Sequence, residues 1–473
     1  MKTYYPTIGL EIHAEMSTDT KMFCKCANNP FEATPNTHTC PVCMAHPGSL
    51  PVPNQEAIEN MIRIGLAVDG KIANFTEFDR KNYFYPDIPK GWQISQYKHP
   101  IVSGGILGGV KLTRIHLEED TATSKHGEDG TLVDYNRAGV PLMELVTEPV
   151  IHTSQEAIHF AKELQLLLRY LGVSHANLEK GEMRVEVNVS ISDDPEKLGT
   201  KVEVKNIASF AMAGKAIDYE VARMADLLEA GRGDEIIQET RGWDDEKGQT
   251  FSQRTKENSE DYRYFPEPDI PKFYLHELYN LEEKKAELPE LPWERRSRYE
   301  GLGLTLDTAE VLIQDQELGS FFENTVIVFS GDEKKIQLAA NYLVSDLVGL
   351  MKNDEEGRLL LKRLNADAFA ELISMTAGGD INSRATKDIL AMLVKEGGDP
   401  RTIAETQGLL QENDIDALRA VAQSILDENP QAVEDYKAGK ETSIKFLVGQ
   451  AMKATKGSAN PQTMEELYKE IIG

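Results

Sequence analysis

Apolar and polar residues alternate along the first part of the chain. From Met1 to about Tyr279, apolar side chains recur mostly at every second position, with frequent breaks at Gly, Pro and Asn. This is the pattern of antiparallel strands. Three stretches, 54–68, 154–171 and 209–230, repeat instead at three and four residues, which predicts helices. The first part is therefore predicted to be an α+β domain built on an antiparallel sheet.

The pattern changes after a charged segment with two prolines, Leu281–Trp293. Beyond Glu294 apolar residues recur at helical spacing, so this part is predicted to be entirely helical. The sequence Gly-Gly-Asp-Pro at Gly397–Pro400 ends one helix and marks a second boundary. Because 473 residues exceed the roughly 250–300 that share one core, we predict three domains, at 1–293, 294–400 and 401–473.

The charge of the chain is strongly negative and unevenly distributed. It has 51 basic and 78 acidic residues, a net charge of −27, which argues against binding nucleic acid over the whole surface. Residues 437–461 nevertheless hold five Lys against one Glu, so a local positive patch is predicted there. No stretch reaches the roughly 18–20 apolar residues of a membrane span, and the first residues lack an apolar signal core. We expect a cytoplasmic protein that does not bind membranes.

All four cysteines lie within twenty residues of one another, which excludes a disulfide framework spread through the chain. They form two close pairs, Cys24-x-Cys26 and Cys40-x-x-Cys43. This spacing suits four thiolates around one Zn²⁺ in the loop 24–43, with no position left open for catalysis. Four incidental thiols, or a site in which His38 or His46 replaces a thiolate, are the alternatives.

Carboxylates recur in three separate segments, two of which also contain a histidine. In IGLEIHAEM the alternation places Glu11 and His13 on one face of a strand and Ile8, Leu10 and Ile12 on the other. RIHLEED adds Glu118, Glu119 and Asp120, and PLMELVTEP adds Glu144 and Glu148 in apolar surroundings. Such a set suits Mg²⁺ or Mn²⁺, although each strand alone is equally consistent with a solvated face.

Two further patterns suggest a binding floor for phosphates. The strands 183–192 and 201–206 place Arg184, Glu186, Glu203 and Lys205 on one face, either toward solvent or toward a substrate. Cations alternate with aromatic rings in 78–97 and 261–271, which favours nucleotide binding but is also ordinary loop packing. No phosphate-binding P-loop and no Rossmann glycine motif is present, so any nucleotide must be held by other means.

Eight segments taken together resemble one known family, the GatB family, which forms the B subunit of the bacterial tRNA-dependent amidotransferase. They are IGLEIHAEM, FDRKNYFYPD, QISQY, LEED, GVPLMELVTEP, VEVKNIASF, DYRYFPEPD and FLVGQAMKATKGSANP. The likeness runs nearly from end to end. It implies a cradle-shaped α+β catalytic domain related to glutamine synthetase, a helical linker domain and a small helical tail similar to the YqeY fold.

The resemblance also implies an activity. ATP phosphorylates the side-chain carboxylate of Glu or Asp mischarged on tRNA-Gln or tRNA-Asn, and ammonia from a partner amidase then displaces the phosphate. The implied partners are the amidase, which is the A subunit of the complex, the small C subunit, and the misacylated tRNA, which the Lys-rich tail is expected to contact. The implied cofactors are ATP and Mg²⁺ or Mn²⁺. The Zn²⁺ expected from the cysteine spacing is assigned a structural role only, because some family members lack these cysteines.

The family's metal-binding residues, carried over by position, are Glu11, His13, Glu119 and Glu144, with Glu118 and Asp120 as neighbours. For contacts to phosphate and nucleotide we infer a separate set of cations, Arg80, Lys81, Arg184, Lys205 and Arg263. Glu186 stands where the family pattern leads us to expect Asp. A tRNA-binding scaffold without catalysis and a two-metal nuclease are the competing interpretations.

Overall fold

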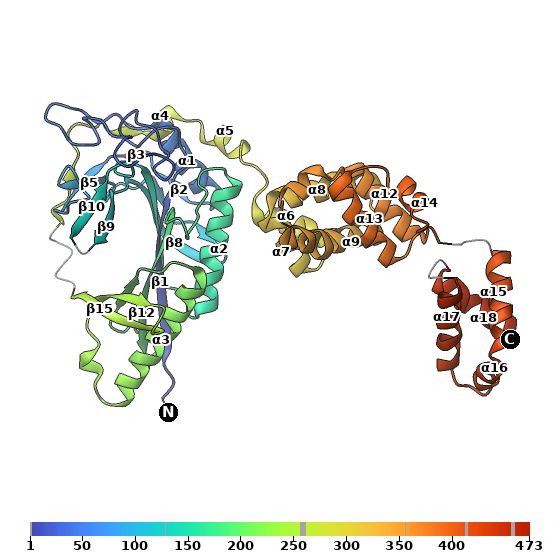
Figure 1. The fold of residues 1–473 in the computed structure, drawn as a ribbon. Coiled ribbons are helices and arrows are strands. Elements are labelled where there is room, and N and C mark those ends of the chain that lie inside the picture. Colours follow the sequence, from blue (N-terminus) through green and yellow to red (C-terminus); the bar gives the residue numbers. More distant parts are fainter. Residues whose placement is uncertain (1, 128, 256–261, 355, 412–414, 456–458) are drawn as a thin grey trace. The chain divides into compact units, whose positions relative to one another are not determined.

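The computed structural model describes residues 2–473 except 128, 256–261, 355, 412–414 and 456–458. The chain forms two compact units, Met1–Pro292 and Trp293–Gly473, both drawn in Figure 1. The first is rich in sheet and the second is helical, which confirms the coarse α and β content predicted from the sequence. The likeness to glutamine synthetase stays a prediction.

A ten-stranded sheet organises the first unit, in the order β15-β14-β13-β12-β1-β11-β8-β6-β2 with β7 beside β8. All neighbours are antiparallel except β13 and β14, which are parallel. The strands are β1 (Tyr5–Glu15), β2 (Lys71–Ile72), β6 (Val102–Ser103), β7 (Ile106–Leu107), β8 (Val110–Glu119), β11 (Pro141–Thr147), β12 (Met183–Ser192), β13 (Val202–Lys205), β14 (Glu239–Asp244) and β15 (Gln249–Thr255).

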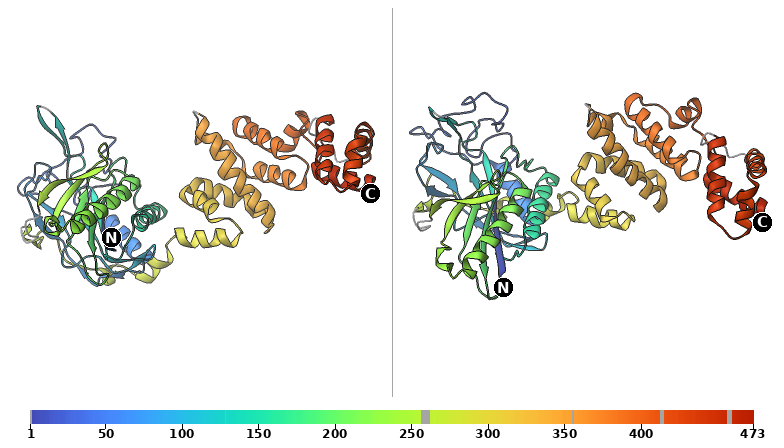
Figure 2. Two further views of the ribbon diagram at one scale, coloured as in Figure 1. Left: turned by 90° about the horizontal axis from the view of Figure 1, so that it is seen from below. Right: turned by 60° about the horizontal axis from the view of Figure 1, so that its bottom comes forward.

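Helices cover one face of this sheet. α1 (Gln55–Ala67), α2 (Ser154–Tyr170) and α3 (Phe210–Glu229) match the three predicted helical stretches. α2 begins with a capping box between Thr153 and Glu156, which satisfies backbone donors at the helix start. α2 contacts α3 and β1, and α3 contacts β12, as Figures 1 and 2 show. The apolar side chains Ile8, Leu10 and Ile12 of β1 are completely or almost completely buried.

Smaller sheets hold the loops beside the main sheet. One consists of β4 (Asp79–Asn82), β5 (Trp92–Ser95) and β16 (Phe265–Pro266). The others are the hairpin of β9 (Thr123–Gly127) with β10 (Gly130–Asp134) and the pair of β3 (Phe75–Thr76) with β17 (Phe273–Tyr274). The short helices η1 (Gly233–Glu235), α4 (Leu275–Leu278) and α5 (Leu281–Ala286) complete the unit. Both aromatic-basic stretches therefore pass through the three-stranded sheet.

The second unit consists of helices, several of which have side-chain caps at their N-termini. They are α6 (Pro292–Gly301), α7 (Leu306–Gln314), α8 (Gln316–Val326), η3 (Ile327–Phe329), α9 (Glu333–Asn341), a π-helical segment at Tyr342–Leu347, α10 (Val348–Asn353), α11 (Leu359–Arg363), α12 (Ala366–Gly378), α13 (Ser383–Glu396), α14 (Pro400–Thr406), α15 (Ile415–Glu428), α16 (Pro430–Lys437), α17 (Thr442–Ala454) and α18 (Pro461–Ile472).

Two groupings are visible within these helices. α14 packs against α12 and α13, and a separate core forms between Leu418 and Ile472 from α15, α17 and α18. The domain boundary expected between residues 400 and 401 stays a prediction. α14, which begins at Pro400, packs against α12 and α13, the helices that precede this boundary. Among the helices described, none is both long and apolar enough to pass through a lipid bilayer.

Candidate active site

Four strands of the central sheet place a row of functional side chains side by side. His13 of β1 lies directly opposite Glu144 of β11 and, on its other side, Arg184 of β12. Glu144 in turn lies opposite His116 of β8. Residues paired directly across antiparallel strands project from the same face with Cβ atoms about 5 Å apart. The row therefore occupies the face away from Ile8, Leu10 and Ile12.

The side chains of this row are close enough to share a ligand. Nε2 of His13 lies 3.3 Å from Oε2 of Glu144 and 3.7 Å from Oε1 of Glu118. Nε2 of His116 lies 3.4 Å from the same Oε2 of Glu144. Ligand atoms of two groups, Glu11 with His13 and Glu144, and His116 with Glu118 and Glu144, lie within 4.8 Å of one another. Glu144 belongs to both groups and is their centre.

A second acidic group lies next to the first on the same sheet. Glu186 of β12 is opposite Glu11, and ligand atoms of Glu11, Glu186 and Glu203 lie within 4.8 Å. Nζ of Lys205 is 2.7 Å from Oε2 of Glu186. Thr240 of β14 donates a 2.7 Å hydrogen bond to Oε2 of the buried Glu203. Three carboxylates and one ammonium thus share this end of the face.

The electrostatics of the face favour bound cations. Burial opposes a charge on His13, but the hydrogen bond and charge of Glu144 and the charges of Glu118 and Glu186 raise its pKa to about 9. Despite burial, His116 and His13 hold the pKa of Glu144 well below its usual range. Burial and then the charges of Glu144 and Glu186 raise the pKa of Glu11. Nδ1 of His13 is buried without a hydrogen-bond partner among the described residues. Hard divalent cations match this set of carboxylate oxygens with imidazole.

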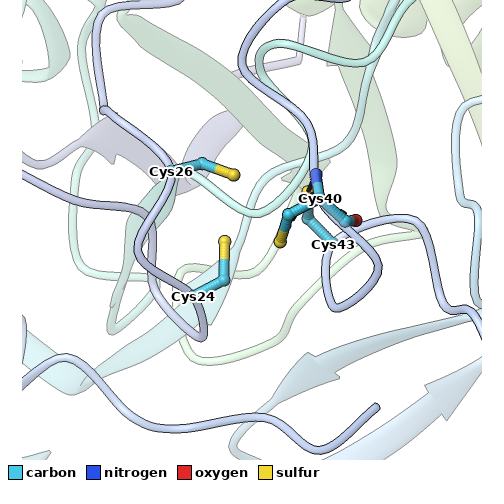
Figure 3. A group of neighbouring side chains, drawn as sticks. All are labelled: Cys24, Cys26, Cys40 and Cys43. Atoms are coloured by element: carbon cyan, nitrogen blue, oxygen red, sulfur yellow. Dashed lines mark hydrogen bonds between the residues drawn. The ribbon is translucent and has the colours of Figure 1, made fainter. Parts of the chain in front are cut away.

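The four cysteines converge in the loop that follows β1, as Figure 3 shows. One ligand atom from each lies within 4.8 Å of the others, and the sulfurs of Cys40 and Cys43 are 3.8 Å apart. Tetrahedral zinc with bonds of about 2.3 Å requires sulfurs about 3.8 Å apart, so these side chains fit the ion. The pKa of Cys43 is lowered to about 4, chiefly by a hydrogen bond from Cys24, and also by the charge of Lys21.

Comparison with known proteins agrees with this organisation. Residues 6–280 match the model of the GatB/GatE catalytic domain, and residues 320–472 match the model of the GatB domain. The chain belongs to the GatB family. Its relatives include the B subunit of the aspartyl/glutamyl-tRNA(Asn/Gln) amidotransferase of Persephonella marina, 43% identical, with 99% of each chain covered. The protein of the same name from Thermus thermophilus is 42% identical over 99% of each chain.

A plant relative extends this comparison. The B subunit of the chloroplastic/mitochondrial glutamyl-tRNA(Gln) amidotransferase of Oryza sativa is 42% identical, over 98% of this chain and 87% of its own. The resemblance to the GatB family deduced from the sequence is therefore confirmed. The second family model starts at residue 320, within α8, and so spans both helical segments that the sequence pattern separates.

One residue carried over from the GatB family pattern, Glu119, does not join the acidic groups. It follows Glu118 directly on β8, so pleating directs it to the opposite face. There its carboxylate lies 2.6 Å from Nζ of Lys90, accepts a hydrogen bond from the backbone N–H of Ile94, and lines a cavity of about 200 Å³ with Cys43 and Trp92. Glu118 occupies the position on the acidic face that was predicted for Glu119.

The five predicted phosphate-binding cations in the GatB-family chain differ in their surroundings. Arg80 donates two hydrogen bonds of 2.7 and 2.8 Å to Glu267 and lies over the ring of Trp92. Arg263 is exposed and has the left-handed φ of 44°. Lys205 faces the second acidic group. The other two cations, Lys81 and Arg184, border the first group.

Lys81 and Arg184 lie against the carboxylates of the face. Burial disfavours the charge of Lys81, but Glu118, Tyr264 and Glu144 raise its pKa. Arg184 donates hydrogen bonds of 3.0 and 3.1 Å to Asp120, whose pKa is lowered to about 2 against the effect of burial by Arg184 and Arg137. Both cations therefore stay charged beside the acidic groups.

Two contributors to the site of this GatB-family chain were not among the predicted site residues. His116 stands in the segment RIHLEED, two residues before Glu118, and the alternation of β8 places both on the acidic face. Ser95 of β5 donates a 3.0 Å hydrogen bond to Oε2 of Glu118. The spacing of His116 from Glu118 was a usable signal for the histidine. Ser95 lies in QISQY, one of the eight segments that carry the resemblance, but the sequence does not reveal its contact with Glu118, which depends on how β5 packs against β8.

Proposed function

We propose that this chain is the ATP-dependent subunit of a tRNA amidotransferase. It phosphorylates the side-chain carboxylate of Glu or Asp attached to tRNA-Gln or tRNA-Asn. Ammonia then converts the activated acid to the amide. Membership of the GatB family and the names of the relatives support the amidotransferase complex. The observation that carries the activation step is the cross-strand row of His13, Glu144 and His116 beside Lys81.

The chemistry of amide formation requires such a site. A free carboxylate resists an amine because oxide is a poor leaving group, whereas an acyl phosphate loses phosphate readily. Two acidic groups, one around Glu144 and one around Glu186, would hold divalent ions. When bound, Mg²⁺ neutralises charge on the transferred phosphoryl group.

The chain's own residues have distinct tasks in this scheme. Lys81 and Arg184 bind anionic oxygens of the nucleotide or of the acyl group, since both border the acidic face. His13 would contribute a neutral ring nitrogen to a bound divalent ion once the imidazole has lost its proton. The stacked pair Tyr97 and Tyr264, with ring centroids 4.3 Å apart, borders Lys81 and offers an aromatic surface to a base.

Ammonia and tRNA need contributions from outside this catalytic face. The sequence has no GxSxG elbow and no evident Ser-Lys amidase motif, so ammonia comes from a partner amidase, the A subunit of the complex, which also includes the small C subunit. The tail supplies the tRNA contact. Lys445 and Lys453 lie on α17 two helical turns apart and are exposed. Lys456, Gly457 and Ser458 of the same predicted patch lie outside the described residues.

A structural zinc ion completes the proposal. The four thiols satisfy all four positions of a tetrahedral ion, so the metal stiffens the loop 24–43 and takes no part in the chemistry. We expect chelation, or Cys40→Ser, to lower the thermal stability of the first unit. Mn²⁺ binding at the acidic face should remain. Equal stability with and without zinc would contradict the structural role.

The decisive experiment measures ADP formation by the complete complex. We expect turnover only when glutamyl- or aspartyl-tRNA is present, and a loss of roughly 100-fold or more in Glu144→Gln. Glu148→Gln is the matched control, because Glu148 lies outside both acidic groups and accepts its hydrogen bond from Thr113. Unchanged turnover in Glu144→Gln would overturn the activation step. Cleavage of labelled tRNA in the absence of ATP would instead support the competing interpretation of the chain as a two-metal nuclease.

A further inference from the structure

Lys21 is a charged residue buried in the interior of the first unit. Its exposed fraction is 1%, and it stands between β1 and the first cysteine pair. Its ammonium donates hydrogen bonds to the carbonyl oxygens of Tyr135, at 3.1 Å, and Ala138, at 2.8 Å. Among the described residues no carboxylate lies within ion-pair distance of Nζ. A buried charge with only neutral acceptors is costly, so a source of negative charge is expected nearby.

The cysteine cluster is the negative group that Lys21 adjoins. A methyl group built on Gly139 would lie 3.6 Å from Cδ of Lys21 and 3.7 Å from Cβ of Cys43, so the two side chains flank the same point. The backbone N–H of Lys21 donates a 2.9 Å hydrogen bond to the carbonyl of Cys26. Glu119 lies 3.8 Å from that point too, but Lys90 already neutralises it at 2.6 Å.

We propose that Lys21 is the buried counter-ion of the metal-loaded cysteine cluster. Four thiolates around one Zn²⁺ leave an excess of two negative charges, which one interior ammonium partly compensates. The inference rests on the proposed zinc site and adds a residue to it that is not a ligand. Residues outside the ligand set commonly tune metal affinity in this way.

The same residue joins the zinc loop to the acidic face. Lys21 holds the carbonyls of Tyr135 and Ala138, and the next residue, Met22, donates to the carbonyl of Gly139 at 2.7 Å. Gly139 donates in turn to the carbonyl of Asp120, whose side chain binds Arg184. On this proposal, loss of zinc reduces the negative charge beside Lys21, which also binds the turn supporting Asp120.

A counter-ion and a purely structural lysine predict different responses to zinc removal. With zinc bound, the negative cluster stabilises the ammonium of Lys21, so replacing Lys21 should lower the melting temperature. Without zinc, the cluster keeps at most the thiolate of Cys43, so replacing Lys21 should cost clearly less stability than it does in the zinc-bound protein. A lysine that acted only through its two carbonyl hydrogen bonds would lower stability in both states.

The test uses the full-length chain with Lys21 replaced by Met, Gln or Arg. Zinc retention is measured by competition with a chromogenic chelator, and melting temperature is measured with and without zinc. We expect Lys21→Met and Lys21→Gln to release zinc at chelator concentrations at least about 10-fold lower, and Lys21→Arg to retain it. Lys21→Gln keeps a donor for the carbonyls, so it serves if Lys21→Met does not fold.

Lys90→Met is the matched control, since Lys90 lines a cavity together with Cys24 and Cys43 but already has a carboxylate partner in Glu119. Its melting temperature should fall equally with and without zinc. Equal zinc retention by the natural chain and by Lys21→Met, or equal losses of stability in both zinc states, would overturn the role of Lys21. Absence of zinc from the natural chain after expression with the metal would instead overturn the zinc site itself.

Discussion

We expect divalent-cation binding at the acidic face to depend on the proton of His13. The neighbouring Glu144 and Glu118 raise the pKa of His13 to about 9 despite its burial, so its imidazole is protonated at neutral pH. Only a neutral imidazole can bind a metal ion, so binding must displace this proton. Because the folded pKa lies above the usual value of about 6.5, affinity should rise with pH until about 9 and then level off.

The size of the effect follows from this pKa. Below pH 9 the neutral fraction of His13 grows about tenfold per pH unit, so Mn²⁺ affinity should rise roughly 100-fold from about pH 6.5 to 8.5, or about 2.7 kcal/mol. Electron paramagnetic resonance of free Mn²⁺ measures the affinity. Calorimetry in two buffers of different ionisation enthalpy counts the released proton.

Variants assign the proton to one residue. His13→Gln should lose most of the pH slope, and His175→Gln, which replaces an exposed histidine, should keep it. Burial also raises the pKa of Glu11, so Glu11→Gln is measured in parallel. An undiminished slope in His13→Gln, or a slope lost only in Glu11→Gln, would refute the reasoning.

Three more outcomes are expected. Asp120→Asn should cost about 2 kcal/mol in urea unfolding at pH 7, and the difference should shrink as pH falls from about 5 toward 2, because the lowered pKa of Asp120 stabilises the fold only while the carboxylate is charged. Ser95→Ala should weaken Mn²⁺ binding about tenfold in the same titration, with Ser95→Thr closer to the natural chain, since Ser95 orients Glu118. Replacing Lys445 and Lys453 together by Gln should lower tRNA affinity in fluorescence anisotropy and reduce its salt slope by about 1 per lysine; an unchanged slope would exclude α17 as the contact.

Local patterns predicted the elements well because each depends on neighbouring side chains. The three helical stretches expected at 54–68, 154–171 and 209–230 appear as Gln55–Ala67, Ser154–Tyr170 and Phe210–Glu229. The alternation around His13 correctly separated the buried apolar residues of β1 from its polar ones. The π-helical segment at Tyr342–Leu347 was not predicted, because its apolar spacing resembles that of an ordinary helix.

The composition of the acidic face depended on information that local patterns lack. The last five residues of β8, Ile115 to Glu119, are all buried, so alternating burial does not tell Glu118 from Glu119. Their faces follow from the register with β11, in which Glu144 lies opposite His116. The partner of Arg80 could not be found either, since Glu267 is 187 residues away in the chain.

The position of β1 in the sheet affects how the chain is made. This strand is synthesised before the other strands of the sheet, yet it lies in the interior of the sheet between β11 and β12. Its two neighbours leave the ribosome only after more than a hundred further residues. During translation β1 is therefore an apolar segment whose backbone N–H and C=O groups have no strand partner. We therefore expect chaperones to bind the nascent chain until residue 192 has emerged. Release of the chain from the ribosome before that point should favour aggregation over folding.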